Sequence, residues 1–252
     1  MTAPSTISVR FWRSRADAAP RQRHAPGGTY GARSMSVRKL FWDDPALTET
    51  EAVVTGVEND VITLDRTVAF AFSGGQESDR GTIAGHAILK AVKGSPCDPL
   101  ELYYTLPAGH GLTPGSRVTV CIDGEARRRL VRLHFAAELV LELVNRHYDH
   151  PEKTGAHISP DKARLDFAWQ GNISVAFPML HERLSALVAA DLPIESSFED
   201  ESTEVRYWSI EGFARVRCGG THPASTGAVG RIRLRRENPG SGRERIVILL
   251  DD

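Results

Sequence analysis

The sequence has few cysteines, almost no net charge and no long hydrophobic run. Its three cysteines, Cys97, Cys121 and Cys218, form a sparse and odd-numbered set. Such a set argues against a disulfide framework and favours a reducing cytoplasm. No apolar run approaches the roughly 20 residues that span a membrane, so we expect no membrane segment. The net charge of −1 offers no overall attraction to nucleic acid, so any such partner would have to meet a local basic surface.

The first 34 residues also lack the apolar side chains that a packed segment needs. They hold six arginines and a single acid, namely Arg10, Arg13, Arg15, Arg21, Arg23, Arg33 and Asp17. A secretory signal is excluded because no apolar stretch of about 7–15 residues is present. We expect residues 1–36 to be a disordered or extraneous basic tail, with Met35 as the functional start. A transit peptide and a basic arm for RNA are the alternatives.

Short strands separated by turn residues are predicted between residues 37 and 125. The segments 52–57, 61–64, 82–89 and 117–122 alternate or run apolar, with turn signals such as Pro114-Gly115 between them. Several short strands at this spacing are typical of a small β-barrel. We therefore expect residues 37–125 to form a β-barrel domain, interrupted by the glycine-rich loop of residues 73–76.

A second domain is predicted over residues 126–252, in which helices flank an antiparallel sheet. Residues 130–144 form an apolar-periodic segment without glycine or proline, and residues 178–190 form a second helix that begins at a proline. Alternation predicts strands at 213–217, 231–235 and 245–250, whereas the acidic residues 195–204 are expected in a solvated loop. Without βαβ alternation the predicted fold class is α+β.

The stretch Cys218-Gly219-Gly220-Thr221-His222 holds a thiol and an imidazole that can bind one divalent ion. Its paired glycines disfavour a helix and allow a positive φ or a close approach of the backbone. Upstream, His134 and Glu138 stand four residues apart and project from one face of the predicted helix. Together these groups predict a zinc site. The alternative is a buried cysteine beside a turn and an ordinary helical pair.

Four patterns occur in order along the chain and carry a family resemblance. The pattern R-x-H-x-A is formed by Arg132, His134 and Ala136, and C-G-G-T-H followed by T-G is formed by residues 218–222 and Thr226-Gly227. The pattern S-G-G-Q-x-x-D-x-G is formed by residues 73–76, Asp79 and Gly81, and K-x-R-x-D-F by Lys162, Arg164, Asp166 and Phe167. With them the chain resembles the free-standing alanyl-tRNA editing proteins (AlaX type), which are related to the editing domains of alanyl- and threonyl-tRNA synthetases.

The resemblance implies ester hydrolysis at the 3′ end of a mischarged tRNA, with Ser- or Gly-tRNA(Ala) as the expected substrates. It implies a bound zinc ion (Zn2+) whose ligands come from the two metal motifs: His134, Glu138, Cys218 and His222. The catalytic candidates are Glu138 and Thr221. Glu138 is either a ligand or a general base, and the sequence leaves that choice open.

Two positions depart from the family's first metal motif. Glu138 stands in place of its second helix histidine, and Phe135 replaces a small hydroxyl residue. A carboxylate can still bind zinc, but it lowers the net charge of the site and with it the power to polarise a carbonyl. Phe135 is expected to reshape the pocket for the aminoacyl group, and Lys153 is a weaker candidate for lining it.

The implied partner is the acceptor stem and 3′ end of a tRNA; neither DNA nor a membrane is expected, and the oligomeric state is left open. The glycine-rich loop is expected to meet the tRNA terminus through Gly74, Gly75 and Gln76, or else to form only a tight turn. Alternation puts three arginines on one strand face as a track for phosphates: Arg231, Arg233 and Arg235. The cluster at residues 127–129 is expected either to contact phosphate or to form a solvated face.

Two other functions stay open on the sequence. One is a metal hydrolase retuned to a different aminoacyl ester or misacylated tRNA, which the departures at Phe135 and Glu138 favour. The other is a non-catalytic relative that binds tRNA or metal. An alanine-activating domain does not fit in 252 residues, so we expect no synthetase activity.

Overall fold

The longest helix, α2 (Gly124–His147), organises the structure. It begins after Asp123, whose carboxylate accepts hydrogen bonds from the backbone N–H groups of Glu125 and Ala126 at 3.0 Å. Such an N-cap satisfies donors that the first turn leaves free, which explains why the helix starts before the predicted residues 130–144. Every residue from 133 to 140 is buried, so this stretch is enclosed on all sides.

The computed structural model describes residues 36–94 and 99–251, which belong to one unit, Met35–Asp252. The predicted tail of residues 1–36 therefore lies outside the described residues, apart from Ser36. Cys97 lies outside them as well. Among the described residues, Cys121 and Cys218 are free thiols.

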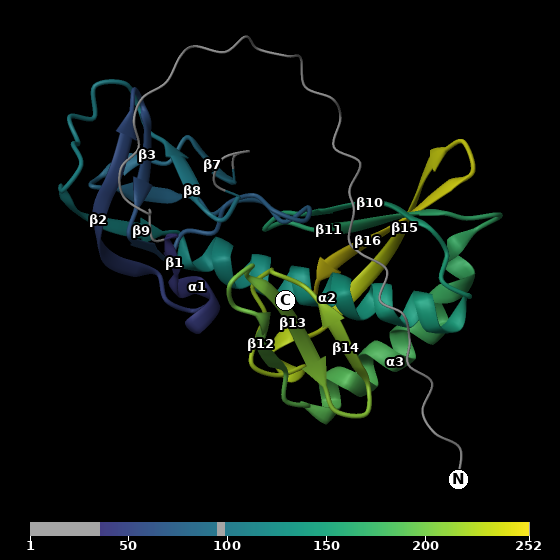
Figure 1. Ribbon diagram of the computed structural model, residues 1–252. Coiled ribbons are helices and arrows are strands. Elements are labelled where there is room, and N and C mark those ends of the chain that lie inside the picture. Colours follow the sequence, from purple (N-terminus) through teal and green to yellow (C-terminus); the bar gives the residue numbers. More distant parts are fainter. Residues whose placement is uncertain (1–35, 95–98, 252) are drawn as a thin grey trace. The chain divides into compact units, whose positions relative to one another are not determined.

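The N-terminal half of this unit contains a seven-stranded antiparallel sheet in the order β6-β5-β9-β2-β3-β8-β7. Its strands are β2 (Glu49–Glu58), β3 (Val61–Leu64), β5 (Gly81–Ile83), β6 (His86–Ala87), β7 (Lys90–Lys93), β8 (Leu102–Thr105) and β9 (Arg117–Ile122). The sheet curls into a half-barrel (Figure 1) where a small β-barrel was expected. The predicted strand 82–89 is wrong, because a turn at Ala84 and Gly85, both with positive φ, splits it into β5 and β6.

Three shorter elements precede or adjoin this sheet. The strands β1 (Arg38–Lys39) and β4 (Arg66–Thr67) pair in parallel, and α1 (Leu40–Asp43) follows β1 directly. They carry Phe41 into the same hydrophobic cluster as Ile62, Leu64 and Val120.

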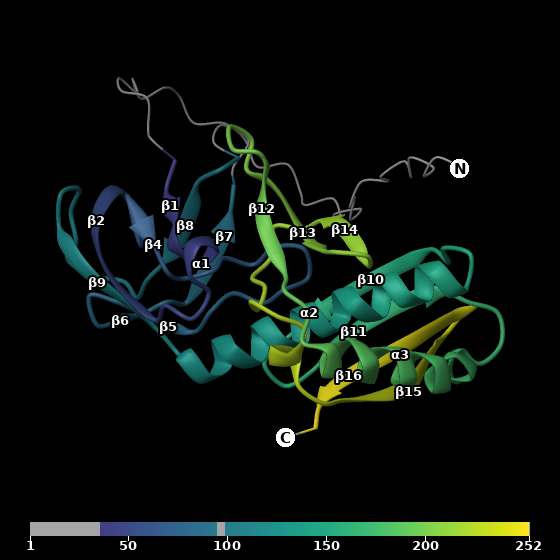
Figure 2. The ribbon, with the colours of Figure 1, turned by 90° about the horizontal axis from the view of Figure 1, so that it is seen from below.

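The C-terminal half contains a four-stranded antiparallel sheet in the order β10-β11-β16-β15. Its strands are β10 (Lys153–Ile158), β11 (Ala163–Ala168), β15 (Ile232–Gly240) and β16 (Arg243–Leu250). The helices α2 and α3 (Phe177–Ala190) lie on the same face of this sheet (Figures 1 and 2). The second predicted helix is confirmed: α3 has a proline in its first turn, and Asp191, with a φ of 46°, caps its C-terminal end. The 3-10 turn η1 (Ile173–Ala176) leads into it.

A third, three-stranded sheet is formed by β12 (Glu195–Asp200), β13 (Val205–Ile210) and β14 (Ala214–Arg217). The prediction of a solvated loop over residues 195–204 is wrong for its first part, which is β12. This strand is an edge strand, so its acidic side chains can stay in water while its backbone pairs with β13. Trp208 of β13 is fully buried and packs against α2.

Two hydrophobic clusters of buried residues underlie these sheets, one beneath the seven-stranded sheet and one around α2 and the four-stranded sheet. The α+β class with antiparallel sheets and few helices is confirmed, while the domain division at residues 125 and 126 stays a prediction. Residues Ile173–Ala190 are long and apolar enough to span a membrane by length and composition alone. That stretch includes η1, and its Leu180 and Leu184 belong to the core.

Candidate metal centre

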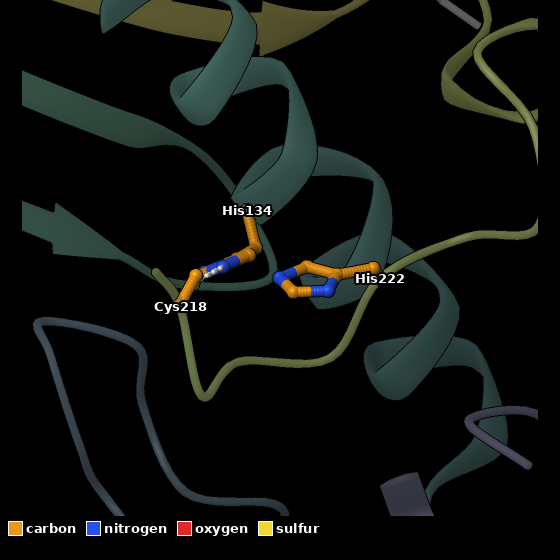
Figure 3. Close-up of side chains that lie close together, drawn as sticks. All are labelled: His134, Cys218 and His222. Carbon is orange, nitrogen blue, oxygen red and sulfur yellow. Dashed lines mark hydrogen bonds between the residues drawn. The ribbon is translucent and has the colours of Figure 1, made fainter. Parts of the chain in front are cut away.

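Three side chains with metal-binding atoms meet where the loop after β14 reaches α2. They are His134 from α2 and Cys218 and His222 from the loop, and one donor atom from each lies within 4.8 Å of the others. The Nε2 atom of His134 is 3.2 Å from Cys218 Sγ, and the two imidazole centroids are 5.4 Å apart. Figure 3 shows the two imidazoles and the thiol converging from these two elements. Three of the four predicted ligands are therefore brought together.

The loop reaches α2 because Gly220 has no side chain. A Cβ added at Gly220 would lie 2.5 Å from Cε1 of His134 and closer still to its Nε2, whereas one added at Gly219 would meet nothing within 4 Å. Neither glycine has a positive φ. A glycine is therefore required only at position 220, where the backbone passes close to the ring of His134. The loop is also held by a hydrogen bond from Cys218 N to Arg206 O at 2.9 Å and one from Trp42 Nε1 to Gly219 O at 3.0 Å.

His222 is oriented as a metal ligand usually is. Its Nδ1 lies 2.9 Å from Ser196 Oγ, while its buried Nε2 has no hydrogen-bond partner among the described residues. A hydrogen bond at one ring nitrogen fixes the ring and leaves the other nitrogen for a metal. A buried polar atom without a partner is costly, and a divalent ion would offset that cost. The residues therefore fit a zinc-type ion with two imidazoles and one thiolate.

Burial disfavours every charged form in this cluster. Burial, with the charge of Lys153 as the second cause, lowers the pKa of His134 to about 4, and burial also lowers the pKa of His222 well below its ordinary value. Burial and the neighbouring Glu138 raise the pKa of the Cys218 thiol well above its ordinary value. Neutral imidazole is the form that binds a metal, whereas the thiol must lose its proton to do so. Metal binding would therefore be coupled to release of the thiol proton.

Glu138 lies beside the three donor atoms rather than among them. Its Oε1 is 3.9 Å from His134 Nε2 and 3.8 Å from Cys218 Sγ, and its Oε2 accepts a hydrogen bond from Trp208 Nε1 at 3.1 Å. Burial raises the pKa of its carboxyl group. Trp208 is a part of this site that the sequence did not single out. The alternation of residues 205–210 indicates that its side chain points inward, but it does not reveal the hydrogen bond to Glu138.

Phe135 and Lys153 flank the cluster in different ways. Phe135 is fully buried, with ring centroids 5.0 Å from Trp208 and 5.6 Å from His222. It therefore packs behind a ligand instead of facing solvent. Lys153 opens β10, where it is paired with the core residue Phe167. Burial lowers the pKa of Lys153 to about 8, while the nearby Glu138 and Cys218 oppose that shift, so its amine lies within electrostatic reach of the cluster.

The glycine-rich loop contacts the loop that carries Cys218 and His222, which we call the ligand loop, through one buried hydrogen bond. Gln76 Nε2 donates to Thr221 Oγ1 at 3.2 Å, and both side chains are buried. The loop also adds to the edge of β10: Ile158 N donates to Gly75 O at 2.7 Å and Glu77 N to Ile158 O at 2.9 Å. A Cβ at Gly75 would lie 2.8 Å from the carbonyl oxygen of Ala156. Gly74 is exposed and Gln76 is not, so only the tip of the loop is open to a ligand.

The aspartate of the glycine-rich motif has a structural role. Asp79 accepts hydrogen bonds from Arg127 Nε at 2.9 Å and from Phe70 N at 2.6 Å, and it is ion-paired with Arg127 Nη2. Arg127 is fully buried and also donates to Val68 O and Pro45 O. The expectation of phosphate contact or a solvated face is therefore wrong for Arg127, which instead ties the start of α2 to the seven-stranded sheet. Arg128 is exposed.

Other motif residues hold the far end of the ligand loop. Arg132 Nε donates to Val229 O at 2.9 Å, in the 3-10 turn η2 (Gly227–Val229). Thr226 Oγ1 donates to Leu187 O at 2.6 Å and accepts from Leu192 N at 2.8 Å. These bonds attach the loop to α2 and to the end of α3, so they fix the position of His222.

The predicted basic strand face lies on β15, at the edge of the four-stranded sheet opposite β10. Arg233 and Arg235 are exposed and alternate with the core residues Ile232 and Leu234, as expected. Arg231 is exposed as well but precedes the strand. Arg235 Nη2 is bonded to Glu237 at 2.6 Å.

Two surface hollows lie away from the cluster. One of about 920 Å3 is lined by residues between Leu192 and Arg215, and the other, of about 410 Å3, by residues of α2, α3 and Phe213. His134, Cys218 and His222 line neither of them. The candidate site is therefore identified by its chemistry and not by volume.

The structure is that of an α+β protein with three metal-donor side chains gathered between a helix and a glycine-containing loop. No family model matches the chain. It is 27% identical over 225 residues to the alanyl-tRNA editing protein AlaX-M of Pyrococcus horikoshii, covering 85% of this chain and 98% of that protein. AlaX-M of Methanosarcina mazei is 29% identical over 246 residues, with 84% and 96% covered.

The alanine–tRNA ligase of Methanopyrus kandleri is 35% identical over 234 residues, which is 82% of this chain and 25% of the ligase. The chain thus spans about a quarter of the ligase's length and nearly all of the AlaX-M proteins. The resemblance given by the motifs is confirmed: the chain is a homologue of the alanyl-tRNA editing proteins of the AlaX type.

Proposed function

We propose that this protein is a metal-dependent hydrolase that deacylates mischarged tRNA in trans. The substrates we expect are Ser-tRNA(Ala) and Gly-tRNA(Ala), and the expected location is the cytoplasm. The observation that carries the proposal is the meeting of His134, Cys218 and His222 within 4.8 Å. The alignment with AlaX-M proteins over almost their whole length supports it.

The three residues would hold a zinc ion, which when bound supplies a Lewis acid for the ester carbonyl or for a water. With only these three side chains as ligands, such an ion would stay accessible to water or to the substrate. Glu138 is held by Trp208 through Oε2, which leaves Oε1 directed toward the cluster as an acceptor for the proton of the attacking water. Burial raises the pKa of Glu138, and a base works best when its pKa approaches the working pH.

Lys153 and Thr221 would position the aminoacyl end of the substrate. The amine of Lys153 is close enough to Glu138 and Cys218 for its pKa to respond to their charges, so it can stabilise negative charge on the ester oxygen. The hydroxyl of Thr221 is fixed by Gln76. A preorganised donor of this kind costs no rearrangement when charge develops.

A deacylation screen tests this function. Purified protein of known metal content is mixed with Ser-, Gly- and Ala-tRNA(Ala), and the release of each amino acid is followed against a Cys218→Ala variant. We expect metal-dependent release of serine or glycine, little release of alanine, and none with the variant. Activity that is unchanged in Cys218→Ala would contradict the proposed site.

A second candidate function is a hydrolase of the same fold that acts on a different aminoacyl ester. The observation that favours it is Phe135, which fills the space between Trp208 and His222. A wider panel of misacylated tRNAs separates the two: release of another amino acid, with Ser- and Gly-tRNA(Ala) intact, would support the second. Stoichiometric metal with no release from any tRNA would support a non-catalytic relative.

A further inference from the structure

One face of the four-stranded sheet carries a group of arginines that the proposed chemistry does not use. The helices α2 and α3 cover the opposite face. In β11 and β16 the residues Leu165, Phe167, Ile246 and Ile248 point to the helix side, because they belong to the core around α2. Successive side chains in a strand alternate between faces. The residues between them therefore form what we call the outer face.

The register of the strands places the outer-face residues in rows. One row runs across the sheet through Gly155, Asp166, Arg245 and Glu237, and the next through His157, Arg164, Val247 and Arg235. Arg243 lies opposite Ala168, and Arg233 opposite Leu249, on either side of these rows. The outer face thus holds five arginines against two carboxylates, which gives it a net charge of +3.

Two carboxylates fix three of the arginines. Asp166 is bonded to Arg245 Nε at 2.6 Å and is ion-paired with Arg164, and Glu237 is 3.2 Å from Arg245 Nη1 and 2.6 Å from Arg235 Nη2. Gly155 has no side chain, and a Cβ there would lie 3.1 Å from Asp166 Oδ2. The guanidinium groups are thereby ordered before a ligand arrives, which lowers the entropy lost on binding.

The second row contains a valine, Val247, whose complete burial is unexpected on a face that no helix of the described residues covers. Val247 is fully buried although it points to the outer face and belongs to neither hydrophobic cluster. The residues directly opposite it on either side are Arg164 and Arg235. Arginine stems commonly cover apolar surface while their charged ends stay in water. Although each is paired with a carboxylate, the side chains of Arg164 and Arg235 stay 32% and 55% exposed, so both can also meet a ligand above the sheet.

The outer face is continuous with the glycine-rich loop. At the edge of the sheet, Gln76 forms a bridge with Ile158 of β10, and Glu77 lies 3.2 Å from His157 of the second row. From the same loop, the side chain of Gln76 reaches Thr221 in the ligand loop. A strand of nucleic acid that lies on the outer face and passes this edge would arrive beside the metal cluster.

We propose that the outer face is the docking surface for the phosphate backbone of the tRNA acceptor stem, with the 3′ end turned over the β10 edge. The proposal rests on the proposed function for the identity of the RNA. Arg233 and Arg243 supply exposed charges, and Arg164, Arg235 and Arg245 supply ordered ones. Such phosphate contacts position the RNA and do not read its sequence. The proposed surface extends the predicted arginine track on β15 across the whole sheet, and it includes Arg164 and Asp166 of the K-x-R-x-D-F motif.

The test measures binding of uncharged tRNA(Ala) to the full chain by fluorescence anisotropy over a series of salt concentrations. The variants are Arg233→Gln and Arg243→Gln, and the matched control is Arg117→Gln, an exposed arginine at the start of β9. The slope of log affinity against log salt should fall by about 0.7–0.9 for each outer-face arginine removed, and the control should leave it unchanged. In deacylation assays the two variants should raise KM and leave kcat unchanged.

Three results would overturn the proposal. One is an unchanged slope in both outer-face variants, and the second is a reduced slope in Arg117→Gln alone. The third is equal affinity and slope for a DNA duplex of the acceptor stem's length, which would show a surface for any polyanion. Because binding is measured without turnover, a protein that binds tRNA through this face but deacylates nothing would refute the proposed function and leave the docking surface standing.

Discussion

The substitution Gly220→Ala is expected to weaken metal binding strongly while leaving the fold intact. Gly220 is the point at which the ligand loop passes the imidazole of His134. A methyl group there would lie 2.5 Å from Cε1 and 3.1 Å from Cδ2 of that ring. Carbon atoms in contact normally stay about 3.5–4.0 Å apart, so the ring or the loop would have to move by about 1 Å.

A movement of that size decides whether His134 can remain a ligand. Metal–ligand distances tolerate deviations of only about 0.2 Å. Loss of a mere hydrogen-bond partner of a ligand already costs about 10–100-fold in metal affinity. Displacement of a direct ligand should therefore lower the affinity for zinc by at least about 100-fold.

The assay is a competition titration of zinc against a chromophoric chelator, with elemental analysis of the purified protein and circular dichroism as a check on folding. Gly219→Ala is the matched control, because its added Cβ meets no atom within 4 Å and its φ is not positive. We expect the control to bind zinc like the wild type. Equal affinities for Gly220→Ala and Gly219→Ala would refute the placement of the ion beside His134.

Three further predictions concern the neighbours of the cluster. Glu138→His should bind metal more tightly, because an imidazole restores the family's ligand, whereas Glu138→Ala should lose metal affinity, turnover or both; metal titration and deacylation measure these. Asp79→Ala should lower the free energy of unfolding in urea by about 3–5 kcal/mol, because it leaves the charge of Arg127 buried without a carboxylate to pair with. Thr221→Val should lower the free energy of unfolding by about 1–3 kcal/mol and reduce turnover, because it leaves the buried amide of Gln76 without an acceptor.

Each of these predictions has its own control. If Glu138→Ala keeps full metal occupancy and full activity, Glu138 is a bystander. For the buried ion pair, the double replacement Asp79→Leu with Arg127→Met should cost less than Asp79→Ala alone, and a larger cost would contradict the argument from an unpaired charge. Thr221→Ser keeps the hydroxyl and should restore both stability and turnover; a serine variant as impaired as valine would point to packing instead.

The parts of the fold that could be predicted are those whose signal is local. The helix at α2 follows from a long apolar period, and β3 and β9 follow from alternation between turn residues. The strand β12 was missed because its side chains are mostly acidic and polar, and only pairing with β13 makes it a strand. Strand formation at a sheet edge depends on a partner that no local pattern reveals.

The candidate metal ligands could be predicted because their spacings are chemical signatures, but the residues that support them could not. Ser196 and Trp208 contact His222 and Glu138 across the chain, and nothing in their own neighbourhood marks that role. Arg127 shows the opposite error. Three consecutive arginines look like a surface cluster, yet position 127 falls on the inward side of α2, where Asp79 neutralises it.

The exchange of histidine for glutamate at position 138 does more than alter the charge of the site. As a fourth ligand, Glu138 would reduce the charge of a zinc site with two imidazoles and one thiolate from +1 to zero. The indole of Trp208 holds only Oε2, and Oε1 faces the cluster at 3.8–3.9 Å from Cys218 Sγ and His134 Nε2. Oε1 could therefore bind the ion without release of the indole, or accept the proton of a water beside it. Metal titration and deacylation by Glu138→Ala separate the two roles: loss of metal affinity indicates a ligand, and loss of turnover with metal retained indicates a base.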